Sequence, residues 1–432
     1  MASKRSAHFA RSPTELPTEV IQEVFTSFAA AISTIDPTQF PWFLGHVCSS
    51  WRRIFRSMTS EFWTSVFIGF DQGDSDNERT AQVVRFFLER DPAAPFSFDV
   101  ILKDCISDFP PEEADHIRQT LEMLVDASMR WKDVYIKACA EDLLPLARAK
   151  NRLPLLRKIQ LQFWPETDEV PDALFEIFQN APSLNVVDMP ELAEWKFNLE
   201  NLTAITLDEL GSGASDFIAA LPQLTNLELL IIGSTFEHDI PSNFILLPNV
   251  TTLNCKPSWL SFFEAHALKD LSIQNEDYDS SISDTVLSFL RRSSCGTNVL
   301  RLCIEGADGT TAAEIIKHTP QIVHLELIDI VDIGEILKPL TISTDTSTNP
   351  LPEPLARQMQ SLSITFTEGD TFEESLMSDL LSSRTAAKDD NHRYKRLQKF
   401  IISTNDDNVS AAVQQRVIAL CQERGVQYVE YD

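Results

Sequence analysis

The apolar positions between residues 16 and 28 follow the period of a helix. They are spaced i, i+1, i+4, i+5 and i+8, which places on one face Val20, Ile21, Val24, Phe25 and Phe28. Pro17 suits a first helical position, where its missing N–H would have no intrahelical partner. A helix of this length cannot bury such a face alone, so we expect it to pack against another element.

A second segment with helical period follows. Its apolar face comprises Leu44, Val47, Cys48, Trp51, Ile54, Phe55 and Met58. The stretch before it, "TIDPTQFPWF", is turn-like, and the stretch after it, "FWTSVFIGF", has the aromatic and β-branched residues of a strand. We therefore expect a disordered N-terminus over residues 1–12 and a small helical module, closed by a strand, over residues 13–70.

Beyond residue 70 a strand pattern recurs, apolar-x-x-apolar-x-apolar. It occurs at Trp131/Val134/Ile136, Leu156/Ile159/Leu161, Leu184/Val187/Met189, Leu202/Ile205/Leu207, Leu224/Leu227/Leu229, Val250/Leu253/Cys255, Leu268/Leu271/Ile273, Val299/Leu302/Ile304, Ile322/Leu325/Leu327, Met359/Leu362/Ile364, Leu397/Phe400/Ile402 and Val426/Val429/Tyr431. The matches start 18 to 38 residues apart, within the range of leucine-rich repeats. A single match carries little weight, because 43% of the residues are apolar.

Helical stripes between these strands are the stronger evidence. They fall at residues 117–125, 174–178, 286–290, 312–316, 376–380 and 413–421. Strands that alternate with helices predict parallel pairing with right-handed crossovers. The sequence therefore predicts an α/β fold, with an irregular leucine-rich-repeat-like solenoid and one parallel sheet over residues 71–432. Polar segments at 341–355 and 384–396 are predicted to be inserted loops.

Charge and composition exclude some classes of function. The 432-residue chain has a formal net charge of −28, which argues against a general nucleic-acid binder. The acidic residues are dispersed, which is typical of a solvated surface, although a basic partner is allowed. We find no export signal and no apolar run long enough to cross a membrane. We therefore expect a cytoplasmic or nuclear protein that does not associate with a membrane. The seven cysteines are widely spaced without a C-x-x-C, which favours reduced, mostly buried thiols.

No catalytic constellation is evident. The stretch "GSGASD" at 211–216 lacks the lysine of a phosphate-binding loop, and we interpret it as a strand-to-helix turn. His318 and His324 have no nearby third ligand, and Arg52, Arg53 and Arg56 fit the solvated side of a helix. We therefore expect no catalytic residues, no cofactor and no metal. A hydrolase would be favoured only if a Ser or Cys, a His and a carboxylate converged in a cleft.

The N-terminal module resembles an F-box, the helical module that docks substrate receptors onto the Skp-type adaptor of cullin–RING ubiquitin ligases. The resemblance rests on "LPTEVIQEVF" at 16–25, "VCSSWRRIF" at 47–55 and "FW" at 62–63. With the repeats, the chain resembles F-box proteins of mushroom-forming fungi. The loop at 29–45 is longer than in compact F-boxes, and the repeat asparagine is replaced by Trp164, Leu192, Leu210 and Ile232.

The resemblance implies a non-enzymatic substrate-recognition subunit of an SCF-type ligase, bound through the adaptor to a cullin. The residues it assigns to the adaptor, or to holding the helix that meets it, are Leu16, Pro17, Val20, Ile21, Val24, Phe25, Val47 and Trp51. Two alternatives stay open. The apolar stripe could close the module's own core, and the protein could be an interaction scaffold that assembles no ligase.

Target binding is predicted on the exposed face of the sheet. In the strand pattern, the third and fifth positions point away from the anchors. The candidates are Lys158, Asp188, Asn226, Glu228, Asp270, Arg301, His324 and Glu326. These residues are polar and mixed in sign, which suits a protein surface better than a small apolar ligand. Any exposed sheet face is polar, however, and the inserted loops are the alternative site.

Overall fold

The structure is a computed structural model of the chain. It describes residues 16–28, 33–34, 42–58, 64–71, 77–163, 170–191, 195–209, 214–234, 243–275, 282–342, 354–366, 374–386, 394–404 and 411–430. The expected disordered segment 1–12 lies outside these ranges, as do residues 343–353 and 387–393 of the two expected loops. No helix among the described residues has the length and apolar character needed to cross a bilayer.

The chain divides into two compact units, residues 1–190 with 194–202, and residues 191–193 with 203–432. The module expected over residues 13–70 belongs to the first unit, where its strand pairs with the next one along the chain. A domain boundary at residue 70 therefore stays a prediction.

The first unit alternates strands with helices, and η marks a 3-10 helix. Its elements are α1 (Thr18–Phe28), β1 (Ser33–Thr34), η2 (Trp42–His46), α2 (Ser49–Ser57), β2 (Ser65–Phe70), α4 (Asn77–Arg90), β3 (Phe96–Leu102), η3 (Ile106–Asp108), α5 (Pro111–Asp126), η4 (Ser128–Arg130), β4 (Trp131–Ala138), η5 (Ala140–Ala149), β5 (Lys158–Phe163), η6 (Asp172–Leu174), β6 (Val186–Glu191) and η7 (Leu199–Asn201).

The second unit continues the alternation. Its elements are β7 (Ala204–Glu209), α6 (Ala214–Ala220), η9 (Leu221–Gln223), β8 (Leu229–Ile232), β9 (Ile245–Leu246), β10 (Thr252–Cys255), α7 (Pro257–Leu260), β11 (Phe263–Glu264), β12 (Asp270–Gln274), α8 (Ile282–Ser293), β13 (Arg301–Glu305), α9 (Gly309–Lys317), β14 (His324–Ile328), α10 (Gly334–Leu340), β15 (Ser361–Phe366), α11 (Glu374–Ala386), β16 (Lys399–Thr404), α12 (Ala411–Arg424) and β17 (Gln427–Glu430).

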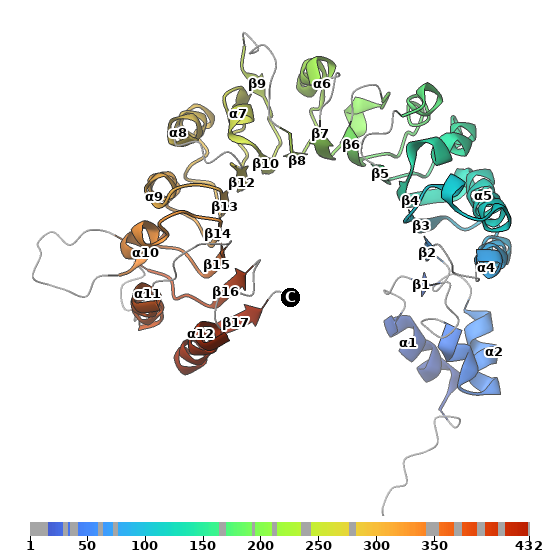
Figure 1. Cartoon of the computed structure of the whole chain (residues 1–432), viewed down its shortest axis with the longest axis horizontal. Coiled ribbons are helices and arrows are strands. Elements are labelled where there is room, and N and C mark those ends of the chain that lie inside the picture. Colours follow the sequence, from blue (N-terminus) through green and yellow to red (C-terminus); the bar gives the residue numbers. More distant parts are fainter. Residues whose placement is uncertain are drawn as a thin grey trace, which may run out of the picture. The chain divides into compact units, whose positions relative to one another are not determined.

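Strands pair in parallel, and the order in the sheet follows the order in the chain. In the first unit the order is β1 to β6, and in the second it is β7, β8, β10 and β12 to β17, with β9 and β11 paired separately. From α4 onward, the helices of each unit lie along one side of the strands (Figure 1). The prediction of a mixed α/β fold with a large parallel sheet is therefore confirmed.

The core of each unit lies between its strands and its helices. Alternate strand side chains point toward the helices. In β14 these are Leu325 and Leu327, which are buried, whereas His324 before them is exposed. The helices contribute an apolar stripe to the same layer, as Ala312 and Ile315 do on α9. The predicted anchors of most strands are buried in this layer.

Three predicted elements differ from the structure. The strand expected at residues 224–229 is β8, which begins at Leu229 and buries Leu230 and Ile232. The stripe expected at 174–178 forms the short helix η6 followed by turns. Residues 384–386, assigned to a loop, form the last turn of α11. In the first case an unbroken apolar run, "LLII" at 229–232, hides which residues alternate inward.

Arginine side chains donate hydrogen bonds to the backbone of other elements. Arg384 on α11 is fully buried and donates hydrogen bonds to three backbone carbonyls: Leu340 (2.8 Å), Leu355 (2.5 Å) and Ala356 (3.1 Å). Burial lowers the pKa of Arg384 to about 10, while Tyr394 opposes the shift. Arg130 and Arg292 bind preceding carbonyls in the same way. These bonds add side-chain donors to backbone carbonyls at the connections between elements, some of which also accept a backbone N–H, as the Ala356 carbonyl does from Met359.

The expectation that the cysteines are all reduced is wrong for one pair. Cys105 and Cys139 form a disulfide. The other five thiols are free, and four of them, Cys255, Cys295, Cys303 and Cys421, are buried as expected. Sequence spacing missed the pair because the two cysteines lie 34 residues apart and meet only through the pairing of β3 with β4.

Candidate functional sites

Helix α1 of the first unit exposes a line of apolar side chains. Val20 and Val24 lie four residues apart on α1 and are 41% and 37% exposed, and Leu16, two residues before the helix begins, is 38% exposed. Side chains four apart lie above one another on a helix, so Val20 and Val24 share one exposed face. Val47, just before α2, is 53% exposed. We call Leu16, Val20 and Val24 the apolar stripe.

The other apolar side chains of α1 close the interior of the first unit. Ile21 and Phe25 are 1% and 0% exposed, and the Phe25 ring meets the half-buried Trp51 ring edge-on at 5.0 Å. Pro17 precedes the first turn, and its carbonyl accepts hydrogen bonds from the N–H groups of residues 20 and 21. The predicted adaptor set therefore divides into exposed residues and residues that hold α1 in place.

A cationic cavity of about 470 Å³ lies beside α2. Its floor includes Phe55 and Phe86, and its basic side chains are His46, Arg52, Arg56, Arg79 and Arg90. Arg52 also donates a hydrogen bond of 2.8 Å to the Gly45 carbonyl. We expected Arg52 and Arg56 to face solvent. The sequence did not reveal the cavity, because the other two arginines, Arg79 and Arg90, come from the separate helix α4.

The second unit carries a polar groove over β13 to β17. The groove has a volume of about 750 Å³, within the range of ligand sites. It is lined by Arg301, Val323, His324, Leu325, Glu326, Gln360, Ser361, Ser363, Thr365, Gln398, Lys399, Ile401, Ser403 and Gln427. Parallel register aligns many of them in rows across the sheet, for example Arg301, His324, Ser361, Lys399 and Gln427.

Charges of both signs meet at one end of this groove. Arg301 Nη2 lies 3.4 Å from Glu326 Oε2, and Asp270 aligns with Arg301 on the neighbouring strand. Burial raises the pKa of Asp270, and Glu326 adds to this shift while Arg301 and His324 oppose it.

Four of the eight predicted target residues lie on this face: Asp270, Arg301, His324 and Glu326. Lys158 and Asp188 lie in the first unit, on the adjacent strands β5 and β6. Asn226 and Glu228 do not lie in a strand, because β8 starts at Leu229. Their place on the sheet face is therefore a wrong prediction, and it follows from the misassigned strand.

Sequence reasoning missed the hydroxyl side chains of the groove. Ser361, Ser363 and Thr365 alternate along β15, and Ser403 lies on β16. Period-2 alternation marks them as outward facing, but nothing in the sequence separates these serines from ordinary exposed ones.

The groove brings serine, histidine and carboxylate side chains onto neighbouring strands. In the described part of the chain, however, no hydrogen bond joins His324 to a serine hydroxyl, and the ion pair of Glu326 is with Arg301. A nucleophile and its base need to be within hydrogen-bond reach, with a third group that orients the base.

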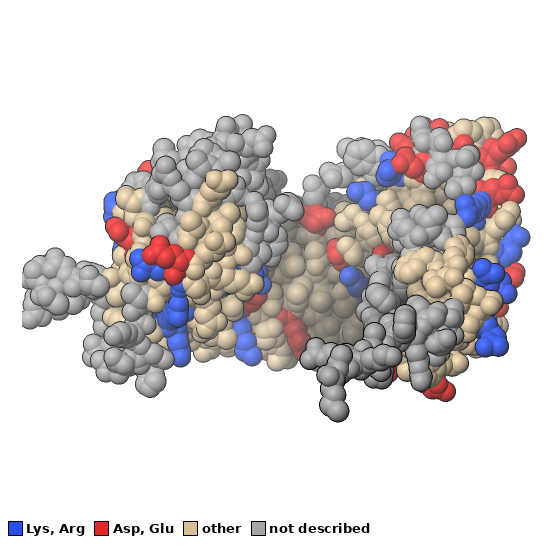
Figure 2. Space-filling model, turned by 90° about the horizontal axis from the view of Figure 1, so that it is seen from below, with Lys and Arg blue, Asp and Glu red and all other residues tan. Residues whose placement is uncertain are grey.

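Acidic and basic side chains are scattered among uncharged ones on the face that Figure 2 shows. Such a surface offers many hydrogen-bonding and ionic partners without a single dominant sign.

The fold and these surfaces define a mixed α/β protein whose parallel strands follow chain order, with an exposed apolar stripe in one unit and a polar groove in the other. No family model matches the chain, and no curated protein is similar to it.

Proposed function

We propose that the protein is a substrate receptor of a cullin–RING ubiquitin ligase. The helices around residues 16–58 act as an F-box that binds a Skp-type adaptor, and the sheet face holds a target protein. The observation that carries the proposal is the apolar stripe of Leu16, Val20 and Val24, which is exposed while its neighbours Ile21 and Phe25 are buried.

The stripe argues for a partner because the module has already closed its own core. Ile21, Phe25, Ile54 and Phe55 are buried within the first unit, so the three stripe residues are not needed for that purpose. Fully burying a valine or leucine contributes about 1.5–3 kcal/mol. An amphipathic helix that keeps a second apolar line in water is typical of a docking element.

For the repeats, we propose degenerate leucine-rich units of one strand and one helix each. Parallel strands in chain order, with helices on one side, support this interpretation. Asn275 also supports it, because its side chain donates a buried hydrogen bond of 2.7 Å to the carbonyl of Gly306, which follows the next strand along the chain. This hydrogen bond joins two neighbouring turns, as the repeat asparagines do in a regular leucine-rich-repeat array.

A scaffold that binds the adaptor without assembling a ligase is the second candidate. Reconstitution with purified adaptor, cullin and RING subunit separates the two. A ligase receptor co-purifies with the cullin only when the adaptor is present, and it loses both partners in a Val20→Asp variant. Adaptor binding without cullin favours the scaffold, and binding of neither overturns the proposal.

For the target, we expect the polar groove to be the contact surface. Once a target is identified by affinity capture, a triple variant, Asp270→Ala, Arg301→Ala and Glu326→Ala, should bind it at least tenfold more weakly, because it removes the charges at one end of the groove. Calorimetry measures the change, and circular dichroism checks the fold. Unchanged affinity would move the contact to the loops around 341–355 or 384–396.

A further inference from the structure

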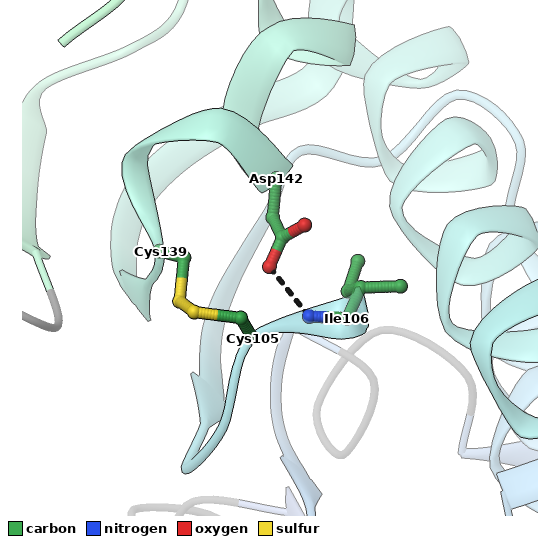
Figure 3. The surroundings of a disulfide bond; sticks show 4 residues. All are labelled: Cys105, Ile106, Cys139 and Asp142. Atoms are coloured by element: carbon green, nitrogen blue, oxygen red, sulfur yellow. Dashed lines mark hydrogen bonds between the residues drawn. A yellow bond between two sulfur atoms is a disulfide. The ribbon is translucent and has the colours of Figure 1, made fainter. Parts of the chain in front are cut away.

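Two segments that follow neighbouring strands carry the disulfide. Cys105 follows β3 and precedes η3, and Cys139 follows β4 and precedes η5. The two strands pair in parallel, so their carboxyl ends meet at one edge of the sheet. The Cα atoms of the two cysteines lie 5.4 Å apart (Figure 3).

A carboxylate lies beside this sulfur pair. Asp142, in the first turn of η5, accepts a hydrogen bond of 2.8 Å from the Ile106 N–H through Oδ2. Figure 3 shows its side chain directed at the segment that carries Cys105. One ligand atom from each of Cys105, Cys139 and Asp142 lies within 4.8 Å of the others. A hydrogen bond to a carboxylate is the kind of contact that orients metal ligands.

We propose that, in the reduced protein, Cys105, Cys139 and Asp142 form a zinc site, with water as the fourth ligand. The inference does not depend on the ubiquitin-ligase proposal. In compartments that keep thiols reduced, paired cysteines more often serve metals or catalysis than structural disulfides.

A dithiol or phosphine reductant supplies two electrons, two protons complete the thiols, and the S–S bond breaks. Zinc then displaces both thiol protons and binds two thiolates and the carboxylate. With Zn–S bonds of about 2.3 Å, tetrahedral thiolates lie about 3.8 Å apart, and a carboxylate oxygen lies about 3.6 Å from each. The sulfurs must move apart by about 1.7 Å from the bonded distance of about 2.05 Å, and the carboxylate must move inward by about 1 Å.

The donor set selects among metals. Thiolate ligands favour zinc over magnesium or calcium, which prefer oxygen ligands. Three protein ligands with one open position are typical of zinc sites that keep a bound water. Cys105 and Asp142 are half-buried, which leaves the site a route to solvent.

Cobalt(II) provides the test, because it substitutes for zinc and gives a thiolate-to-metal charge-transfer absorption. Full-length protein, reduced and then freed of reductant under nitrogen, should bind about one cobalt ion per chain with this absorption, and zinc should displace it. Cys105→Ser and Cys139→Ser should abolish the absorption, and Asp142→Asn should weaken cobalt binding at least tenfold. Unreduced protein should show no such band.

Matched controls are Cys48→Ser and Asp115→Asn, because Cys48 is a half-buried free thiol and Asp115 is an exposed carboxylate on α5. Neither should change the titration. The proposal is overturned if the reduced parent gives no charge-transfer band, if Cys105→Ser keeps it, or if Asp142→Asn binds cobalt as tightly as the parent.

A second measurement needs no variant. Zinc should slow alkylation of Cys105 and Cys139 in the reduced parent at least tenfold, mapped by mass spectrometry, while Cys48 reacts at its original rate. Equal protection of all three thiols, or of none, would contradict the site even if a cysteine variant failed to fold.

Discussion

Gly306 connects two neighbouring turns in the second unit. It follows β13 with a φ of +66°, a left-handed conformation that side chains disfavour. A Cβ at this position would lie 2.0 Å from the Asn275 carbonyl oxygen. The side chain of Asn275 in turn donates to the Gly306 carbonyl. The close approach of the two turns therefore requires glycine.

We predict that Gly306→Ala lowers the free energy of unfolding by about 2 kcal/mol or more, from the left-handed strain and the displaced turn. Gly69→Ala is the matched control, because the nearest atom to its Cβ is 3.5 Å away. It should change stability by less than about 1 kcal/mol. Urea unfolding measures both. A Gly306→Ala variant as stable as the parent would contradict this turn geometry.

Residue by residue, alternation in the sequence predicts inward-facing anchors well where apolar and polar positions alternate. In β14, "HLELI" shows which side chains face the helices. In β8, "LLII" is apolar throughout, so only tertiary packing selects Leu230 and Ile232 as the buried pair. The misplacement of Asn226 and Glu228 follows from that ambiguity.

Among the elements, α9 has a well-formed N-terminus. Asp308 accepts hydrogen bonds from the N–H groups of Thr310 (3.0 Å) and Thr311 (2.9 Å), and from both threonine hydroxyls. Burial alone would raise the pKa of Asp308, but these hydrogen bonds outweigh burial and lower the pKa below its usual value. The ionised carboxylate therefore stabilises the folded state.

We predict that Asp308→Ala costs about 1 kcal/mol of stability at neutral pH. Because the folded pKa is the lower one, the contribution is present above the unfolded pKa of about 3.9 and is lost as pH falls through the folded pKa. The gap between variant and parent should therefore narrow in acid. Unfolding curves at several pH values measure it, with the exposed Asp115→Ala as control. A gap independent of pH would contradict the cap.

Strand–helix alternation predicted most elements, whereas contacts between distant elements were beyond the sequence. The disulfide depends on the register of β3 with β4, and the cationic cavity depends on α4 lying beside α2. The spacing of the cysteines and of the arginines does not reveal these contacts. The disulfide and the cavity both depend on how elements that are distant in the chain pack together.

At the scale of the whole molecule, the two units present different surfaces. The first presents the apolar stripe, and the second presents the polar groove. The sequence predicted a helical face of Val20, Ile21, Val24, Phe25 and Phe28 but left open whether it closes a core. The structure shows that Ile21 and Phe25 are buried while Leu16, Val20 and Val24 remain exposed.

The most direct test of the account is calorimetric titration of the full chain with a purified Skp-type adaptor. The parent should bind, and Val20→Asp should bind at least tenfold more weakly, about 1.4 kcal/mol, because a charge replaces an apolar contact. Val331→Asp is the matched control, since Val331 is 45% exposed in the second unit, and it should bind like the parent. A folded Val20→Asp variant that binds the adaptor as tightly as the parent would contradict the account.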